Sequence, residues 1–175
     1  MAYVHKINRI HRDLKSGNLL VSKSLNIKVS DFGTTTITRQ RNNVKKIETT
    51  EFSNNIRLQR TGMFGTLMWM APEDLQGEQS YGHKADVYSY GIVLWEIAAQ
   101  RLPWEDLPDA YFLCNNPAFH DLLQEGRRPV VDAAWPTAYC QLMRQCWATQ
   151  PNSRPEFSEA CAIFLDSNEL KGSLG

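Results

Sequence analysis

The chain has 175 residues, of which 42% are hydrophobic and 22% charged, a composition that is usual for a soluble globular domain. Its 19 Lys and Arg residues balance 19 Asp and Glu residues, so no overall field attracts nucleic acid or an anionic membrane surface. No stretch approaches the roughly 18 apolar residues of a membrane span, and the N-terminus has no signal-peptide pattern.

The four cysteines lack both a CxxC spacing and a histidine at ligand spacing, so the pattern disfavours a metal site. A chain of this length does not need a disulfide framework. We therefore expect reduced thiols packed in a helical core, and a cytoplasmic location. The cysteines are Cys114, Cys140, Cys146 and Cys161.

The sequence of the first half of the chain indicates little regular structure. Its first twenty residues read as the end of a helix followed by a loop. Two short β-prone runs, 19–21 and 27–29, flank a turn-rich stretch and predict a small hairpin. From Thr34 to about Met63 the periodicity disappears, which predicts a long, mobile, solvated loop.

The second half predicts helices. Residues 86–98 are apolar nearly all round, as expected of a helix buried at the centre of a domain. Further helical stretches are predicted at about 111–124, 137–147 and 156–165, separated by connections that contain proline. We find no internal repeat and no second domain, so the pattern indicates one mostly helical unit with a small β-element near its start.

Three short motifs carry the strongest chemical signal. Residues 11–18, HRDLKSGN, match the pattern H-R-D-L-x-x-x-N at every specified position. The tripeptide DFG follows at 31–33, after the predicted hairpin, and APE stands at 71–73. A lone tripeptide would mean little, but three motifs in this order do not arise easily by chance. Over nearly its whole length the chain resembles the catalytic domain of eukaryotic protein kinases.

The resemblance implies an α+β family fold, of which this mostly α chain would be the C-terminal lobe, with a small hairpin beside the catalytic loop. We expect a kinase lobe over 1–166, with the catalytic loop at 11–18 and the activation segment at 31–73, followed by a tail at 167–175. The family also requires a Gly-rich G-x-G-x-x-G loop and a strand lysine that pairs with a helix glutamate. The sequence contains neither motif, so we expect the N-terminal lobe to be absent.

Phosphoryl transfer depends on positioning and on neutralising phosphate charge. By resemblance, Asp13 accepts the proton of the substrate hydroxyl and Lys15 contacts the γ-phosphate. Asn18 and Asp31 are oxygen donors of the kind that Mg²⁺ prefers. The resemblance thus implies ATP and Mg²⁺ as cofactors, with catalytic roles for Asp13, Lys15 and Asn18, ATP contacts from Lys15, Asn18 and Asp31, and metal contacts from Asn18 and Asp31.

Further roles are implied around this centre. Arg12 would clamp a phosphorylated residue of the activation segment through charge-assisted hydrogen bonds. The candidate phosphosites are Thr61, Thr49 and Thr50, with Thr34 and Ser53 as weaker candidates. Thr66 would lie in the loop that receives the substrate.

Five residues have structural roles by the same resemblance. Glu73 and Arg154 would form an ion pair that anchors the end of the activation segment. Asp86 would brace the backbone of the catalytic loop. His11 and Phe32 would be packed residues, with His11 hydrogen-bonded rather than acting as an acid or base.

The substrate class is indicated by two residues. Lys15 and Thr66 are typical of serine/threonine kinases, whereas the contexts of Trp69, Trp95 and Trp147 resemble tyrosine kinases. The tyrosine-kinase-like group of serine/threonine kinases combines both features, and a tyrosine or dual-specificity kinase is the alternative. The implied partners are a protein substrate and an upstream kinase.

The absent motifs leave two hypotheses open. In the first, the chain is a fragment of an active kinase and is itself inactive or nearly so. In the second, it is a non-catalytic lobe that acts as a binding or scaffold module. The complete set of catalytic-loop residues favours the first. A phosphatase or a metal-dependent nuclease has no motif support.

Overall fold

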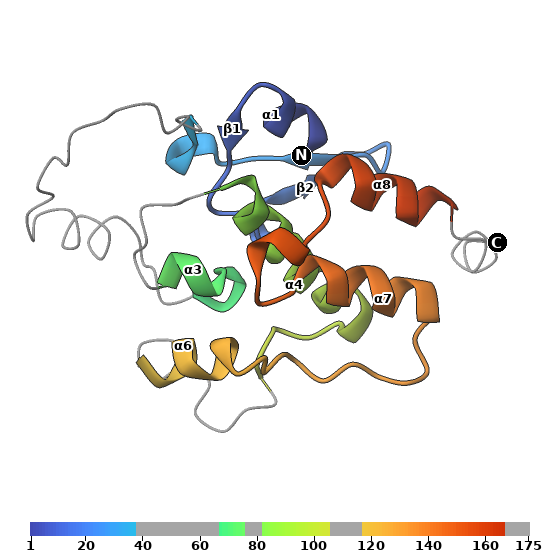
Figure 1. The fold of residues 1–175 in the computed structure, drawn as a ribbon. Helices are drawn as coiled ribbons and strands as arrows, with labels where there is room; N and C mark the ends of the chain where they lie inside the picture. Colours follow the sequence, from blue (N-terminus) through green and yellow to red (C-terminus); the bar gives the residue numbers. More distant parts are fainter. Residues whose placement is uncertain (38–66, 76–81, 106–116, 167–175) are drawn as a thin grey trace, which may run out of the picture.

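A computed structural model describes residues 1–37, 67–75, 82–105 and 117–166, and these form a mostly helical unit with two small two-stranded sheets (Figure 1). The α-helices are α1 (Ala2–Lys6), α3 (Pro72–Leu75), α4 (His83–Ala99), α6 (Pro117–Gln124), α7 (Thr137–Cys146) and α8 (Phe157–Asp166). The strands are β1 (Arg9–Ile10), β2 (Leu19–Val21), β3 (Ile27–Val29) and β4 (Thr36–Ile37). Short 3-10 turns are η1 (Ser16–Asn18), η2 (Phe32–Thr34), η4 (Leu67–Trp69) and η5 (Pro151–Ser153).

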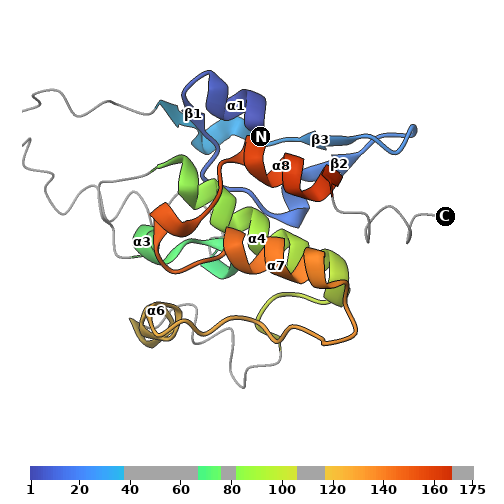
Figure 2. The same cartoon turned by 45° about the vertical axis from the view of Figure 1, so that its right-hand side comes forward.

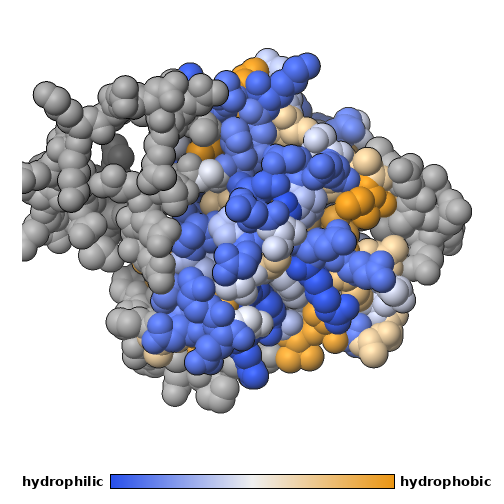
Figure 3. Space-filling view, in the orientation of Figure 1, coloured by the Kyte–Doolittle hydropathy of each residue, from blue (hydrophilic) through white to orange (hydrophobic). Residues whose placement is uncertain are grey.

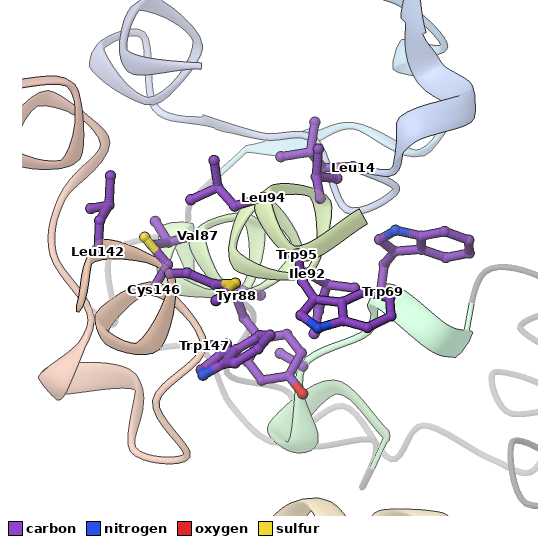
Figure 4. Packing of buried hydrophobic residues seen from close by; sticks show 14 of the residues in the cluster. Leu14, Trp69, Val87, Tyr88, Ile92, Leu94, Trp95, Leu142, Cys146 and Trp147 are labelled. Atoms are coloured by element: carbon purple, nitrogen blue, oxygen red, sulfur yellow. The ribbon is translucent and has the colours of Figure 1, made fainter. Parts of the chain in front are cut away.

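Helix α4 lies at the centre of the described fold, and the buried helix predicted at 86–98 is confirmed. Side chains on several sides of α4 are buried, among them Val87, Ile92 and Trp95, as the nearly uniform apolar sequence requires. Figure 4 shows Leu14 and Trp69, which come from two other segments, packed near the same helix. The burial of α4 makes it a firm support for the segments that contact it.

Gly91 allows helices α4 and α7 to approach closely. A Cβ atom built at Gly91 would lie 3.0 Å from both the Cys146 Cβ atom and the Trp147 backbone nitrogen. The Tyr139 hydroxyl of α7 donates a hydrogen bond to the Leu94 carbonyl of α4 at 2.6 Å. Helix α7 is therefore packed directly onto the central helix.

The predicted hairpin is confirmed by the antiparallel pairing of β2 with β3 (Figure 2), in which Leu19 lies opposite Val29. The turn is closed by hydrogen bonds from the Ser22 amide to the Asn26 carbonyl and from the Asn26 amide to the Ser22 hydroxyl. Four apolar side chains of this hairpin are exposed, namely Leu20, Val21, Leu25 and Ile27.

The second sheet includes residues that were predicted to lie in a loop. Strand β4 pairs antiparallel with β1, with Ile10 opposite Thr36, and η2 forms just before it. The prediction of a loop from Thr34 onward was thus wrong as far as residue 37, because a partner distant in sequence supplies backbone hydrogen bonds that no local pattern reveals. The rest of that predicted loop, from 38, lies outside the described residues.

The three helices predicted after α4 are found, although the residues 111–116 of the first lie outside the described part. Cys140 and Cys146 are buried thiols, as predicted. Cys161 of α8 is exposed, so that prediction was wrong for it, because Phe157 and Ala160 occupy the core-facing positions of the helix.

The visible face of the described fold is largely hydrophilic, with separate apolar areas (Figure 3). Among the described residues, no helix combines the length and the apolar character that crossing a membrane requires.

Candidate active site

The loop that follows β1, residues 11–18, is held by one buried carboxylate. Asp86, in the first turn of α4, is 1% exposed. Its Oδ2 atom accepts a hydrogen bond from the His11 backbone amide and its Oδ1 atom one from the Arg12 amide, both at 2.8 Å. Arg12 has a φ of +71°, a left-handed conformation that costs free energy in a residue other than glycine. The carboxylate of Asp86 thus holds the loop where its backbone is strained.

His5 also contacts the Asp86 carboxylate that holds the loop. Its Nε2 atom lies 2.8 Å from the Asp86 Oδ2 atom, and its ring packs edge-on against Phe157 with centroids 5.0 Å apart. The sequence analysis assigned no role to His5. A histidine six residues before His11, at the end of a short helix, has no local signal that would distinguish it from a surface residue.

His11 uses both of its ring nitrogens. Nε2 lies 2.9 Å from the Ser30 carbonyl oxygen, which can only accept, so this nitrogen carries the proton. Nδ1 accepts a hydrogen bond from the Asp13 backbone amide at 3.3 Å. The neutral ring is also edge-on to Phe32, with centroids 4.9 Å apart. His11 therefore joins the loop to the segment that carries Asp31 and has no free nitrogen to serve as a base.

Three residues predicted to be catalytic meet at Asp13, which is 8% exposed. The Oδ2 atom lies 3.0 Å from Lys15 Nζ and accepts a hydrogen bond of 3.0 Å from Asn18 Nδ2. Asn18 Nδ2 also donates to the Asp13 carbonyl at 2.7 Å. The Oδ1 atom is buried and has no hydrogen-bond partner among the described residues. One carboxylate oxygen is thus fixed by neighbours, while the other retains its capacity to accept a proton.

Asp31 stands at the start of η2 with a φ of +58°, and its Oδ1 atom accepts a hydrogen bond from the Gly33 amide at 3.3 Å. Its side chain is exposed. The preceding residue, Ser30, donates to the Asn18 carbonyl from its amide at 2.9 Å and from its hydroxyl at 3.0 Å. Asn18 and Asp31 are therefore held on adjoining stretches of backbone.

The donor set fits Mg²⁺ bound together with phosphates. Within the described ranges, no group of three or more His, Cys, Asp or Glu residues could enclose a metal ion. Mg²⁺ is usually held by one or two carboxylates and by substrate phosphates rather than by a cage of protein ligands. The exposed Asp31 and the Asn18 side chain, which contacts Asp13 from an adjoining stretch of backbone, match that arrangement.

Glu73 of α3 and Arg154 come together in a bidentate ion pair. Arg154 Nη1 lies 2.6 Å from Oε1 of Glu73, and Nη2 lies 2.9 Å from Oε2. Arg154 is 2% exposed and also donates to the backbone carbonyls of Lys84, Ala148 and Thr149. The buried charge is thus fully hydrogen-bonded, which is the condition under which such a pair is tolerated.

The remaining predicted residues lie elsewhere. Thr49, Thr50, Ser53, Thr61 and Thr66 lie outside the described residues. The Thr34 hydroxyl donates to the His11 carbonyl at 2.9 Å, which ties it to the loop. The backbone of Arg12 is placed by Asp86, and its role as a phosphate clamp stays a prediction.

Glu96 is a second residue whose role no sequence motif predicted. Its Oε2 atom accepts a hydrogen bond from Trp69 Nε1 at 2.6 Å, and its Oε1 atom one from the Ser16 hydroxyl at 2.9 Å. Burial raises the pKa of Glu96 above its ordinary value, and the hydrogen bonds from Trp69 and Ser16 lower it by less. A single acid in the otherwise apolar run 90–99 was the signal that could have revealed it.

Comparison with known proteins identifies the family of this chain. A family model described as protein tyrosine and serine/threonine kinase matches residues 1–164. The chain belongs to this family, as the motifs predicted.

Several curated kinases are similar to the chain. It is 36% identical over 169 residues to a serine/threonine/tyrosine-protein kinase of Arabidopsis thaliana, covering 97% of this chain and 37% of that protein. It is 37% identical over 171 residues to a probable LIM domain-containing serine/threonine-protein kinase of Dictyostelium discoideum, covering 97% of this chain and 22% of that protein. The chain thus spans well under half the length of these relatives.

Proposed function

We propose that this chain is the C-terminal lobe of a protein serine/threonine kinase and supplies the catalytic loop for transfer of the ATP γ-phosphate to a protein hydroxyl. The observation that carries the proposal is the state of Asp13, whose Oδ2 atom is bound by Lys15 and Asn18 while the buried Oδ1 atom has no partner among the described residues. In this proposal the kinase lobe extends over 1–166, with the activation segment at 31–73 and a tail at 167–175.

The proposed chemistry follows from the geometry. The Oδ1 atom of Asp13 accepts the proton of the substrate hydroxyl while the hydroxyl oxygen forms its bond to the γ-phosphorus. The bond from this phosphorus to the ADP oxygen breaks at the same time. Lys15 is held beside Asp13 and can neutralise charge on the transferred phosphoryl group. Asn18 and Asp31 would hold Mg²⁺, which supplies further charge neutralisation when bound.

Transfer to serine or threonine is favoured over tyrosine by Lys15 and Thr66 in the sequence, and the names of the relatives support this specificity. One relative is named a serine/threonine/tyrosine kinase, so dual specificity is the competing outcome of the test. The protein substrate, an activating upstream kinase and the cytoplasmic location stay predictions.

The exposed side chains of the hairpin support the view that this chain works with a further part of a kinase domain. Leu20, Val21 and Ile27 are each more than half exposed, and the Phe32 ring is 47% exposed. An apolar surface of this kind is unusual unless something packs on it. We therefore expect the isolated 175-residue chain to bind Mg-ATP weakly and to transfer no measurable phosphate.

The test uses the native polypeptide that contains this sequence, purified from its source and incubated with radiolabelled Mg-ATP and a mixed protein substrate. We expect phosphate on serine and threonine, and loss of the signal in the same polypeptide carrying Asp13→Asn. Phosphate mainly on tyrosine would overturn the specificity. A folded native polypeptide without any transfer would instead support the scaffold hypothesis.

A further inference from the structure

Glu96 joins two segments that flank the proposed reaction centre. It lies near the end of α4, is half-buried, and receives one hydrogen bond on each carboxylate oxygen. The donor to Oε1 is Ser16, the first residue of η1, and the donor to Oε2 is Trp69, the last residue of η4. These donors are more than fifty positions apart in the chain, and a single side chain on the central helix links them.

Each of the two segments bears on the site. The turn η1 ends at Asn18, which donates to both the carbonyl and the carboxylate of Asp13. The turn η4 comes at the end of the activation segment, directly after Thr66. A link between these turns therefore connects the proposed substrate-receiving segment to the residues that hold Asp13.

The turn η4 is fixed to its surroundings by further hydrogen bonds. The Ser89 hydroxyl donates to the Trp69 carbonyl at 2.8 Å, and Trp104 Nε1 donates to the Met68 carbonyl at 3.0 Å. These contacts attach η4 to α4 and to the loop after it, but neither reaches the catalytic loop. The Trp69 indole bond to Glu96 is the contact that continues to Ser16.

The chemistry at Glu96 indicates more than packing. Burial disfavours the ionised carboxylate, so an ionised Glu96 costs stability at neutral pH. Glutamine has the same shape without that cost, but it offers one acceptor oxygen where two donors converge. The carboxylate is present despite the cost of burying it, and each of its oxygens binds a different segment. This is the arrangement expected of a residue with a functional role.

We propose that Glu96 is a positioning residue that couples the 67–69 turn at the end of the activation segment to the 16–18 turn of the catalytic loop. Order in one turn then stabilises the other through a shared, charge-assisted acceptor. The catalytic consequence rests on the proposed kinase function, whereas the coupling itself is a property of this chain.

The link is tested first by the indole NMR signals of the ¹⁵N-labelled chain. Trp69→Phe assigns the Trp69 signal, which we expect to shift with pH as Glu96 titrates and to lose that shift in Glu96→Gln. Trp95 is the internal control, because its indole group donates to the backbone carbonyl of Val130, which does not titrate and lies outside both turns. A Trp69 signal that is insensitive to pH in the wild-type chain would overturn the proposal.

The coupling is tested by amide hydrogen exchange at Asn18, whose amide donates to the Lys15 carbonyl at 3.0 Å. We expect Glu96→Gln to speed this exchange about tenfold, since hydrogen bonds to charged groups are the stronger ones. Trp69→Phe should speed it in the wild-type background but add little in Glu96→Gln. Glu125→Gln, which alters an exposed acid after α6, is the matched control. Equal effects of Trp69→Phe in both backgrounds would contradict the coupling.

The catalytic consequence is measured on the native kinase polypeptide described above. Glu96→Gln should lower kcat by about tenfold and leave the KM for Mg-ATP nearly unchanged, because Glu96 acts on positioning rather than on the nucleotide. An unchanged kcat would overturn the positioning role. If the wild-type polypeptide transfers no phosphate, the proposed kinase function fails, while the NMR and exchange results still decide whether Glu96 couples the two turns.

Discussion

The catalytic loop and the β2–β3 hairpin adjoin each other in the chain but differ in how they are supported. The loop is held by hydrogen bonds to Asp86, contains the buried side chain of Leu14, and is linked to η4 through Glu96. The hairpin has its own backbone pairing, yet Leu25 is 82% exposed and Leu20 is 55% exposed. The described part of this chain therefore contains the residues that orient Asp13, the proposed catalytic base, while the exposed apolar side chains of the hairpin are not covered by any described residue.

The largest expected effect comes from breaking the ion pair between Glu73 of α3 and Arg154. Arg154→Met removes a buried guanidinium and leaves Glu73 without its partner, so we expect the unfolding free energy to fall by about 3–5 kcal/mol. Urea denaturation measures the loss. Arg144→Met, at an exposed position of α7, should change stability by less than about 0.5 kcal/mol. Equal effects of the two substitutions would contradict the anchoring role of Arg154.

Asp86→Asn should be the next most damaging change. The substitution replaces one acceptor oxygen by an NH₂ group, which can only donate. The Asp86 carboxylate accepts hydrogen bonds from the His11 and Arg12 amides and contacts His5, so the NH₂ group would face donors. Because hydrogen bonds to charged groups are costly to lose, we expect a loss of about 3 kcal/mol in urea denaturation. Asp121→Asn, at an exposed position of α6, is the control, and a similar small effect at both positions would refute the bracing role of Asp86.

A smaller effect is expected from the titration of Glu96. Its pKa is raised by burial, so between its ordinary value of 4.5 and the raised value the folded chain holds more protons than the unfolded chain. The stability contributed by this group is therefore lost as pH rises through that window. Urea denaturation of wild type and Glu96→Gln across pH 4.5 to 7.5 should show the wild type losing stability relative to the variant as pH rises. The opposite slope would show that hydrogen bonding outweighs burial.

The smallest effect is expected in the hairpin, and a matched pair of leucines makes it informative. Leu25→Ala should change the unfolding free energy by less than about 0.5 kcal/mol, because the side chain is already in solvent. Leu14→Ala in the catalytic loop, where the side chain is 3% exposed, should cost about 3 kcal/mol. A large loss in Leu25→Ala would mean that the hairpin is covered after all, by self-association that light scattering would detect.

Much of the fold was predictable from local patterns. The nearly uniform apolar run of α4, the alternation of turn and β-prone residues around 22–26, and the spacing of the three kinase motifs are all written in adjacent residues. Strand β4 was not predictable, because two residues carry no periodicity and their partner in β1 lies more than twenty positions away. Cys161 was misplaced because the sequence of α8 alone does not tell which face meets the core.

The site likewise contains residues that local motifs predicted and residues that they did not. Its motif residues were identified by resemblance, and the structure brings Asp13, Lys15 and Asn18 together. His5 and Glu96 could not be assigned, because their partners Asp86, Ser16 and Trp69 come from distant parts of the chain. A local pattern indicates which chemistry is present, whereas the residues that hold it in place depend on long-range contacts.

The most direct test of this account is amide hydrogen exchange along the isolated chain. Because the catalytic loop is braced by the central helix, the His11, Arg12 and Asn18 amides should exchange only through openings about as costly as those that expose α4. The amides of β2 and β3 should exchange through smaller, local openings. Amides of the 11–18 loop that exchange as fast as those of the hairpin would contradict the claim that this chain alone orients Asp13, the proposed catalytic base.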